Sequence, residues 1–280
     1  MRIVQKKIKG ESANIYYEQF ESYQEFLKIV EERDRTNAHG HHTLRENVGD
    51  WNGVKTYEEA KDLLMNGWEA KVEYLKKCVE KEIDTIDQKR LTKVFNDVVG
   101  FMPVVPMAIM NLPNCMLNVR QSVKKQKVIK FLIDRTFGCG VNSDDAIKYF
   151  SKVLARISVL EKNGYRCRIE ILQNYSSESW SKTRAMFSML IKSENQLFDI
   201  KRMAFPIAHT SMFRTFGFAW ENSLPIAYES YHQSTLGRGW MYWNKTSRER
   251  MLDALNEANE KTVYVHYNKD LDEIFGKEVI

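Results

Sequence analysis

Asp134 and Thr136 are the residues whose types and spacing are best suited to chemistry, because they directly follow an apolar run at 128–133. A second apolar run, at 167–172, lies beyond an amphipathic segment, so residues 127–173 indicate a β-α-β unit. Its first strand would end at an acid, on the edge where open α/β sheets present ligands. Carboxylate and hydroxyl oxygens suit Mg²⁺ or Mn²⁺. Asp134 and Thr136 are therefore candidate metal ligands, and Asp134 the centre of a metal-dependent hydrolase.

The alternative for Asp134 is a structural role, capping the turn before the following helix. Arg135, beside it, would then neutralise the acid or contact a partner protein. No other catalytic pattern supports an enzyme. Gly138-Cys139-Gly140-Val141 lacks the third glycine and the following Lys-Ser/Thr of phosphate-binding loops. No Ser or Cys nucleophile lies in a recognisable elbow.

Three histidines, His39, His41 and His42, are spaced closely enough to share a transition-metal ion. No Cys or carboxylate stands at zinc spacing around them. The surrounding polar, glycine-containing segment favours an ordinary surface loop.

Basic residues gather in one part of the chain, although the formal net charge is only +5. Residues 120–214 hold 18 Lys and Arg against 8 Asp and Glu. Such a segment attracts phosphate backbones or acidic partners; scattered solvated charges are the alternative. The candidate nucleic-acid contacts are Lys124, Lys125, Lys127, Arg166 and Arg168.

An aromatic segment at 228–243 surrounds Gly237-Arg238-Gly239. Aromatic rings beside Arg stack on bases, and Trp, Tyr and Arg are also frequent hot spots of protein interfaces. Packing over the core is the third interpretation. The candidate partner-binding residues here are Arg238, Trp240, Tyr242 and Trp243.

Composition indicates a globular, cytoplasmic protein. No apolar run reaches the roughly 20 residues that span a bilayer, and the N-terminal residues lack the apolar core of a secretory signal. The four cysteines form no C-x-x-C pair, as expected in a reducing compartment. We expect no membrane partner.

Three regions position these candidates. Residues 1–95 predict a mainly helical region, preceded by an extended arm or two short strands and containing a helix capped by Thr56 and Glu59. Residues 96–125 are apolar and contain three prolines, so they predict a bent connector that packs away from solvent.

Residues 126–280 predict an α/β domain with a mixed sheet flanked by helices. Ser143 is the expected N-cap of a helix that ends at Gly164. A third strand, at 184–192, would pair antiparallel with the second. A helix at 198–220 comes next, and Pro206 within it predicts a kink or a late start of the helix. A helix at 248–260 and a closing strand at 262–267 follow.

The order β-α-β-β-α, ending in α-β, resembles that of von Willebrand factor A-like domains, a Rossmann-like α/β fold. Their metal loop, Asp-x-Ser-x-Ser, corresponds here to Asp134-Arg135-Thr136-Phe137-Gly138. The resemblance covers about 126–280 and implies that Asp134 and Thr136 are the ligands retained. Gly138 replaces the last Ser, so the loop is degenerate.

A second resemblance covers most of the chain. The run from Trp51 to Trp68, the segment from Gly100 to Met116 and the segment from Met212 to Glu221 are similar to uncharacterised proteins encoded by bacteriophages and prophages. This implies a phage setting but no mechanism.

These observations together predict a phage-encoded binding or adaptor protein of the host cytoplasm, without catalytic residues. Its partner would be a host or phage protein, bound with or without Mg²⁺ or Mn²⁺ at the Asp134 loop; self-association is a further expectation. Interference with a host defence complex is a setting that fits. Nucleic-acid binding and metal-dependent hydrolysis are the alternatives.

Overall fold

The structure is a computed structural model. It describes residues 2–7, 14–36, 52–85, 92–121, 128–137, 140–176, 183–224, 238–239, 245–255 and 262–276.

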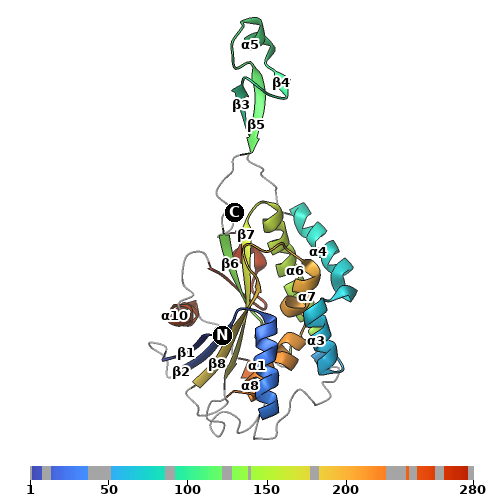
Figure 1. Ribbon diagram of the computed structural model, residues 1–280, viewed down its shortest axis with the longest axis vertical. Coiled ribbons are helices and arrows are strands. Elements are labelled where there is room, and N and C mark those ends of the chain that lie inside the picture. The colour runs from blue at the N-terminus through green and yellow to red at the C-terminus, as the bar shows by residue number, and fades with distance from the viewer. Residues whose placement is uncertain are drawn as a thin grey trace.

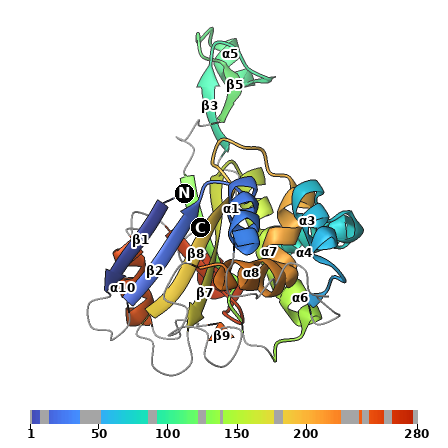
Figure 2. The ribbon, with the colours of Figure 1, turned by 60° about the horizontal axis from the view of Figure 1, so that its bottom comes forward.

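A mixed sheet forms the centre of the body, with strand order β1-β2-β8-β7-β6-β10, and β9 pairs with β7 (Figure 2). Its strands are β1 (Arg2–Lys7), β2 (Asn14–Phe20), β6 (Val128–Asp134), β7 (Arg166–Ser176), β8 (Thr183–Lys192), β9 (Arg238–Gly239) and β10 (Thr262–His266). β6 runs parallel to β7, and β8 runs antiparallel to β7, as predicted. The closing strand β10 pairs with β6 and runs parallel to it. The predicted α/β class, with a mixed sheet flanked by helices, is therefore confirmed.

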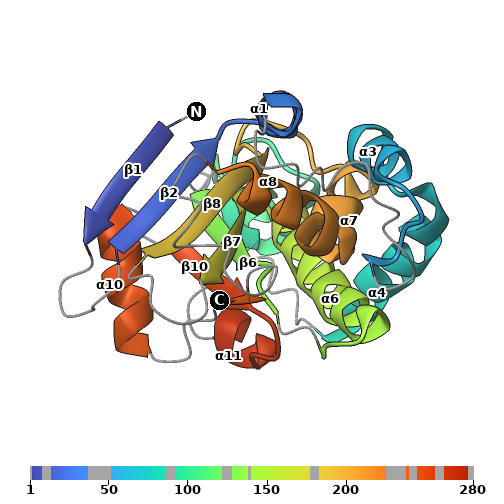
Figure 3. The same ribbon diagram turned by 90° about the horizontal axis from the view of Figure 1, so that it is seen from below.

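Helices cover one face of this sheet (Figure 3). They are α1 (Tyr23–Thr36), α3 (Tyr57–Asn66), α4 (Val72–Thr85), α6 (Ser143–Lys162), α7 (Ile200–Ala208), α8 (Phe218–Asn222) and α11 (Leu271–Gly276), with a 3₁₀ turn at η1 (Glu69–Lys71). Side chains that alternate along the strands build the core beneath them: Phe131 and Ile133 of β6 and Ile171 of β7 belong to it. This period of two is what a two-faced strand requires.

A second, smaller core lies on the opposite face. The intervening strand residues, such as Leu132 and Leu172, pack there with Met251, Leu252 and Leu255. These three side chains come from α10 (Lys245–Leu255), which covers this face (Figure 3). Apolar residues on both faces explain why β6 reads as a continuous apolar run.

Both predicted helix N-caps are formed, and one of them is shifted by one residue. Thr56 Oγ1 accepts from the Glu59 backbone N–H at 3.1 Å at the start of α3. For α6 the N-cap is Asn142 rather than Ser143, because the Asn142 side chain accepts from the Asp144 N–H at 2.9 Å. Gly164 follows α6 with φ of 89°, a left-handed conformation that favours glycine.

The segment predicted as one helix at 198–220 is three elements. α7 contains Pro206 and ends at Ala208, and the backbone of the next residue, His209, is extended. A π-helical turn, η2 (Met212–Gly217), follows and leads into α8. Gly217 of η2 lies against β7, where a Cβ atom would stand 1.8 Å from Tyr175 Oη and 2.2 Å from Gln173 Oε1.

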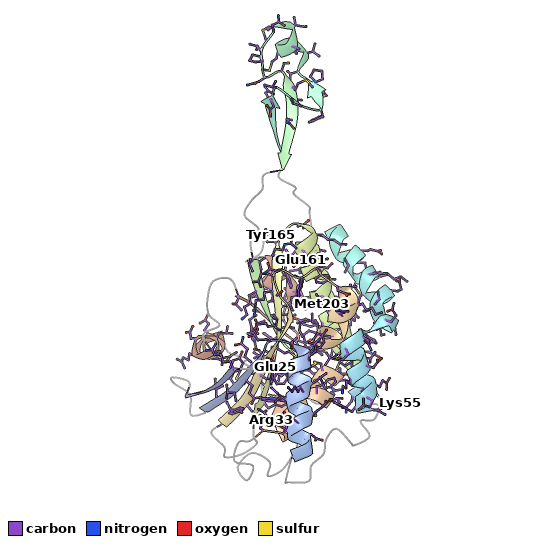
Figure 4. All side chains as sticks on the ribbon, viewed as in Figure 1. Glu25, Arg33, Lys55, Glu161, Tyr165 and Met203 are labelled. Atoms are coloured by element: carbon purple, nitrogen blue, oxygen red, sulfur yellow. The ribbon has the colours of Figure 1, made fainter. Side chains whose placement is uncertain are left out.

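Glu18 of β2 is a fully buried carboxylate that joins elements distant in sequence. Arg33 of α1 donates to both of its oxygens, at 2.7 and 3.0 Å, and Figure 4 shows Arg33 on this helix. Trp220 of α8 donates from Nε1 at 2.7 Å, and Tyr16 donates from its hydroxyl at 2.6 Å. β2 is thereby fixed both to α1, which follows it in the chain, and to α8, whose Trp220 lies 202 positions from Glu18.

A small second sheet, β3-β5-β4, belongs to residues 92–121, here called the tip module. Its elements are β3 (Thr92–Asp97), β4 (Met102–Pro103), α5 (Val105–Ile109) and β5 (Met116–Gln121). Figure 1 shows the tip module standing apart from the body. The prediction that this segment packs away from solvent is wrong: none of the side chains at 96–118 is buried.

The predicted region boundaries at 95 and 125 stay a prediction. The main sheet is built from strands that lie on both sides of them. β1 and β2 come from the first region and complete the same sheet as β6 to β10. The helical content predicted for that region is present in α1, α3 and α4.

The close contact at Gly217 predicts that the stability of the fold is sensitive to a larger residue at this position. Gly217→Ala should lower the free energy of unfolding by about 2 kcal/mol or more, because Cβ has no room beside Tyr175 and Gln173. Gly140→Ala is the matched control, since nothing lies within 4 Å of a Cβ there; it should change stability by less than about 1 kcal/mol. Urea unfolding of both variants measures the difference, and equal stabilities would contradict the packing described.

Candidate functional site

Asp134 lies at the carboxyl end of β6, as predicted, but it is fully buried and surrounded by donors. The Thr136 backbone N–H donates to its Oδ1 at 2.9 Å. Asn174 of β7 donates from Nδ2 to Oδ2 at 3.1 Å, and the Tyr264 hydroxyl of β10 donates to the same oxygen. Three neighbouring strands therefore converge on one carboxyl group.

Thr136 lies beside Asp134, so the two predicted ligands are brought together. The Thr136 hydroxyl oxygen accepts from the Asn174 backbone N–H at 2.9 Å. A divalent ion would have to displace these donors from both residues. In the described ranges no group of three or more His, Cys, Asp and Glu residues is arranged to hold a metal. The donor set around Asp134 thus does not fit an ion as it stands.

Burial controls the protonation of this carboxyl group. It raises the pKa of Asp134 from 3.8 to about 6, against the hydrogen bonds from Thr136, Tyr264 and Asn174, which lower it. Asn174 Oδ1 is buried without a hydrogen-bond partner. If the side-chain amide of Asn174 rotates by about 180°, its oxygen can accept a hydrogen bond from the protonated carboxyl group of Asp134.

Arg135, predicted to contact a partner, is fully buried as well. Its guanidinium stacks over the Phe150 ring, 4.0 Å from the centroid, and donates from Nη2 to the His209 carbonyl at 2.8 Å. Burial lowers the pKa of Arg135 to about 9; Asp134 opposes this shift, and nearby Arg214 adds to it. In the folded chain Arg135 contributes packing within the body and presents no surface to a partner.

A polar cluster that the sequence did not reveal lies next to Arg135, where α7 gives way to η2. Thr210 and Ser211 donate from their hydroxyls to the Asn52 carbonyl at 3.1 and 2.6 Å. The Ser211 backbone N–H donates to His209 Nδ1 at 3.1 Å. Burial, followed by the charge of Arg135, lowers the pKa of His209 to about 3. His209 is thus a neutral ring at physiological pH, holding the chain where α7 ends.

Of the other residues predicted to bind a partner or nucleic acid, some are described by the structure and the rest lie outside the described ranges. Arg168 of β7 pairs with Glu170 at 2.7 Å and with Glu194 at 3.6 Å, so its charge is already compensated. Arg166 is half-buried on the same strand, and Arg238 lies in β9 opposite Ser176. The predicted residues outside the described ranges are Lys124, Lys125, Lys127, Trp240, Tyr242 and Trp243, together with His39, His41 and His42.

Among the residues that the structure describes, most of the exposed large apolar side chains lie on the tip module. No residue from 98 to 119 carries a charge, and this stretch is called the apolar tip. Large apolar side chains are exposed all along it, and Figure 4 shows them pointing outward. The exposed members are Val98, Val99, Phe101, Met102, Val105, Ile109, Met110 and Leu112. Exposed apolar side chains gathered in one module are typical of binding surfaces.

Hydrogen bonds hold the apolar tip in a defined shape. The Phe101 backbone N–H donates to the Leu117 carbonyl at 2.9 Å, and that of Val104 donates to the Cys115 carbonyl at 2.7 Å. At Gly100 a Cβ atom would stand 2.1 Å from the Leu117 carbonyl oxygen, so the two strands approach at a position that glycine alone allows. The exposed side chains are therefore presented by an ordered backbone.

A signal for this surface exists in the sequence. Three prolines and Gly100 divide the apolar run into pieces too short for a buried helix. The stretch between the flanking Lys and Arg residues contains no charge. In the sequence of a core segment, apolar residues would alternate with polar ones. Neither Thr92–Asp97 nor Met116–Gln121 alternates strictly between apolar and polar residues, so the hairpin itself carries no such signal.

Among the helices in the described ranges, none is both long and apolar enough to cross a membrane. Comparison with known proteins places the chain in a family: a family model described as "Domain of unknown function (DUF7192)" matches residues 3–273. No curated protein matches the chain, and no solved structure matches it.

The raised pKa of Asp134 predicts a pH dependence of stability. The folded chain keeps this proton up to about pH 6 and the unfolded chain only to about 3.8, so folding takes up a proton between these values. The contribution of Asp134 is therefore complete below the lower value and is lost as pH rises through 6. The loss is about 3 kcal/mol, since one pKa unit is worth about 1.4 kcal/mol.

Asp134→Asn removes the titrating group and should remove this loss. Urea unfolding from about pH 4 to about pH 7 should show the stability of the wild-type chain falling relative to that of the variant. Asp145→Asn, at an exposed position in α6, is the control and should track the wild type. A constant gap between wild type and Asp134→Asn would show that Asp134 does not titrate in this window.

Proposed function

We propose that this chain, which belongs to the DUF7192 family, is a binding or adaptor protein that acts through protein–protein interaction. In this proposal a bacteriophage encodes it, and it binds a host or phage protein in the host cytoplasm. Interference with a host defence complex is one setting for that activity. The observation that carries the proposal is the ordered, uncharged surface of the apolar tip.

The chemistry of the apolar tip favours a protein partner. Protein interfaces are depleted of charge at their centre and enriched in aromatic residues and Met. The exposed side chains at the tip include Phe101, Met102 and Met110. Met side chains adapt their shape to a partner and are common on binding surfaces. Exposing them costs free energy in the isolated chain, which a partner recovers by covering them.

The body serves in this proposal as a von Willebrand A-like support with a closed ion site. The succession β6-α6-β7-β8-α7, followed by α10-β10, supports that likeness. The donors around Asp134 support a structural role for the acid. Binding is thereby assigned to the tip module instead of the strand end, and Mg²⁺ or Mn²⁺ has no part in it.

The proposal predicts that polar substitution of the apolar tip abolishes binding without affecting the body. Val99 and Ile109 are 73% and 79% exposed, so the double variant Val99→Asp, Ile109→Asp should fold normally. Loss of hot-spot contacts worth about 2 kcal/mol should lower partner capture by roughly tenfold or more. Tagged chains retained from host lysate, with the captured proteins counted by mass spectrometry, measure this effect.

Leu197→Asp is the matched control. Leu197 is 84% exposed on the body, between β8 and α7. This variant adds a charge at an equally accessible apolar position and should capture the same partner as the wild type. The proposal fails if no captured protein depends on the apolar tip, or if both substitutions reduce capture equally.

A further inference from the structure

We infer that two copies of this chain form a dimer in which the apolar tip of each covers that of the other. The inference goes beyond the proposed function, because it concerns the protein before any other partner is bound. The partner protein proposed above would then bind in competition with the second copy. What carries the inference is the lack of burial in the tip module, together with the composition and area of the surface that it exposes.

The tip module has regular strands but no core of its own. From Asn96 to Asn118 no side chain is buried, and α5 buries none of its side chains. Figure 1 shows the module standing apart from the body. An isolated hairpin is at best marginally stable in water, and a small sheet needs a hydrophobic face that is covered. The regular fold of the module therefore indicates a covering surface that is present whenever the chain is folded.

A second copy of the chain meets this condition. It is present wherever the chain is made, whereas a transient partner is absent for part of the time. Most soluble oligomers are closed assemblies of identical chains, and the two-fold dimer is the commonest of them. In a two-fold dimer the same patch lies on both sides of the interface, so the patch must be complementary to itself.

The composition of the apolar tip fits this requirement. No residue from 98 to 119 is charged, so two copies of this stretch bring no like charges together. Transient interfaces are only about as apolar as the rest of a protein surface, whereas homodimer interfaces are about 65% apolar. Permanent interfaces resemble a domain core divided in two. An uncharged surface that carries Val, Ile, Phe and Met belongs to this second class.

The area of the exposed apolar surface is also what a dimer needs. Eight large apolar side chains of the apolar tip are between 41% and 79% exposed. Full burial of such a side chain removes on the order of 100 Å² from water, so together they present on the order of 500 Å². A standard interface buries about 800 Å² on each partner, and the apolar share between identical chains is about 65%. The two apolar areas agree.

A lipid surface is disfavoured as the cover. β3 and β4 are the edge strands of their sheet, and open sheet edges do not occur in the hydrocarbon region of a bilayer. Asn111 and Asn114 are exposed among the apolar side chains. Trp and Tyr, which are enriched at membrane interfaces, are absent from residues 98–119. A second copy can instead pair edge-strand backbone groups and amides by hydrogen bonds.

Sedimentation equilibrium of the purified full-length chain tests the inference. Interfaces of standard size have dissociation constants from micromolar to picomolar, so the wild-type chain should be a dimer at about 20 μM. Val99→Asp with Ile109→Asp places carboxylates in the interface, and each substitution occurs twice in the dimer. The dissociation constant should therefore rise roughly thousandfold or more. Leu197→Asp, at an 84% exposed position on the body, should leave the dimer unchanged.

Hydrogen exchange of backbone amides provides a second measurement. The N–H groups of Phe101 and Val104 donate to carbonyls across the tip module, and that of Arg135 donates to the Leu172 carbonyl in the body. The two tip amides should exchange about tenfold faster or more in the monomeric variant, and in the wild-type chain diluted below its dissociation constant. The Arg135 amide is the internal reference and should stay protected. Equal protection of the tip amides in monomer and dimer would show that the module needs no cover.

The remaining outcomes separate this inference from the proposed function. A wild-type chain that is a monomer at about 20 μM, or a dimer that the tip substitutions do not weaken, overturns the inference; capture of a partner through the apolar tip would still support the proposed function. A tip-dependent dimer without any tip-dependent partner upholds the inference and counts against the proposed function. A monomer that sediments with vesicles of phosphatidylcholine and phosphatidylserine through its tip would replace the second copy by a membrane.

Discussion

The buried carboxylate of Glu18 constrains the whole body. A charge removed from water must be surrounded by donors, or it costs several kcal/mol. Arg33, Trp220 and Tyr16 supply these donors from α1, α8 and β2 itself. Since Trp220 lies far along the chain, the position of β2 depends on α8 being in place. The N-terminal strands and the helices around 200–222 are therefore parts of one cooperative structure.

The strand end at Asp134 follows the same rule. Its carboxyl group sits where α/β sheets bind ligands, yet side chains of β7 and β10 satisfy it from within the body. Arg135 is held between Phe150 and the His209 carbonyl in a similar way. An edge that serves as a ligand site in other folds is used here for internal connection. Most of the exposed large apolar side chains in the described ranges lie instead on the tip module, between α4 and β6 in the sequence.

Local patterns predicted the elements well, and distant contacts explain what they missed. Apolar runs, the Thr56 cap and Gly164 are decided within a few residues, so β6 to β8, the start of α3 and the end of α6 could be foreseen. The partners of Asp134 are 40 and 130 positions away, at Asn174 and Tyr264, and no local pattern announces them. The prediction that the apolar tip is buried is wrong because a hydrophobic composition does not by itself require burial. Exposure there is set by the hairpin that Gly100 and Leu117 close.

The tip module enters and leaves the fold at neighbouring points. Thr92 and Gln121 are register partners, so the two ends of the module are separated by the width of one strand pair. An insertion whose ends coincide in space can be shortened, exchanged or transplanted without moving the elements that flank it. Under the proposed function, changes within the module would alter the choice of partner without disturbing the packing of the body. The module could accordingly be shortened or replaced as a unit, with its two ends joined at the register positions of Thr92 and Gln121.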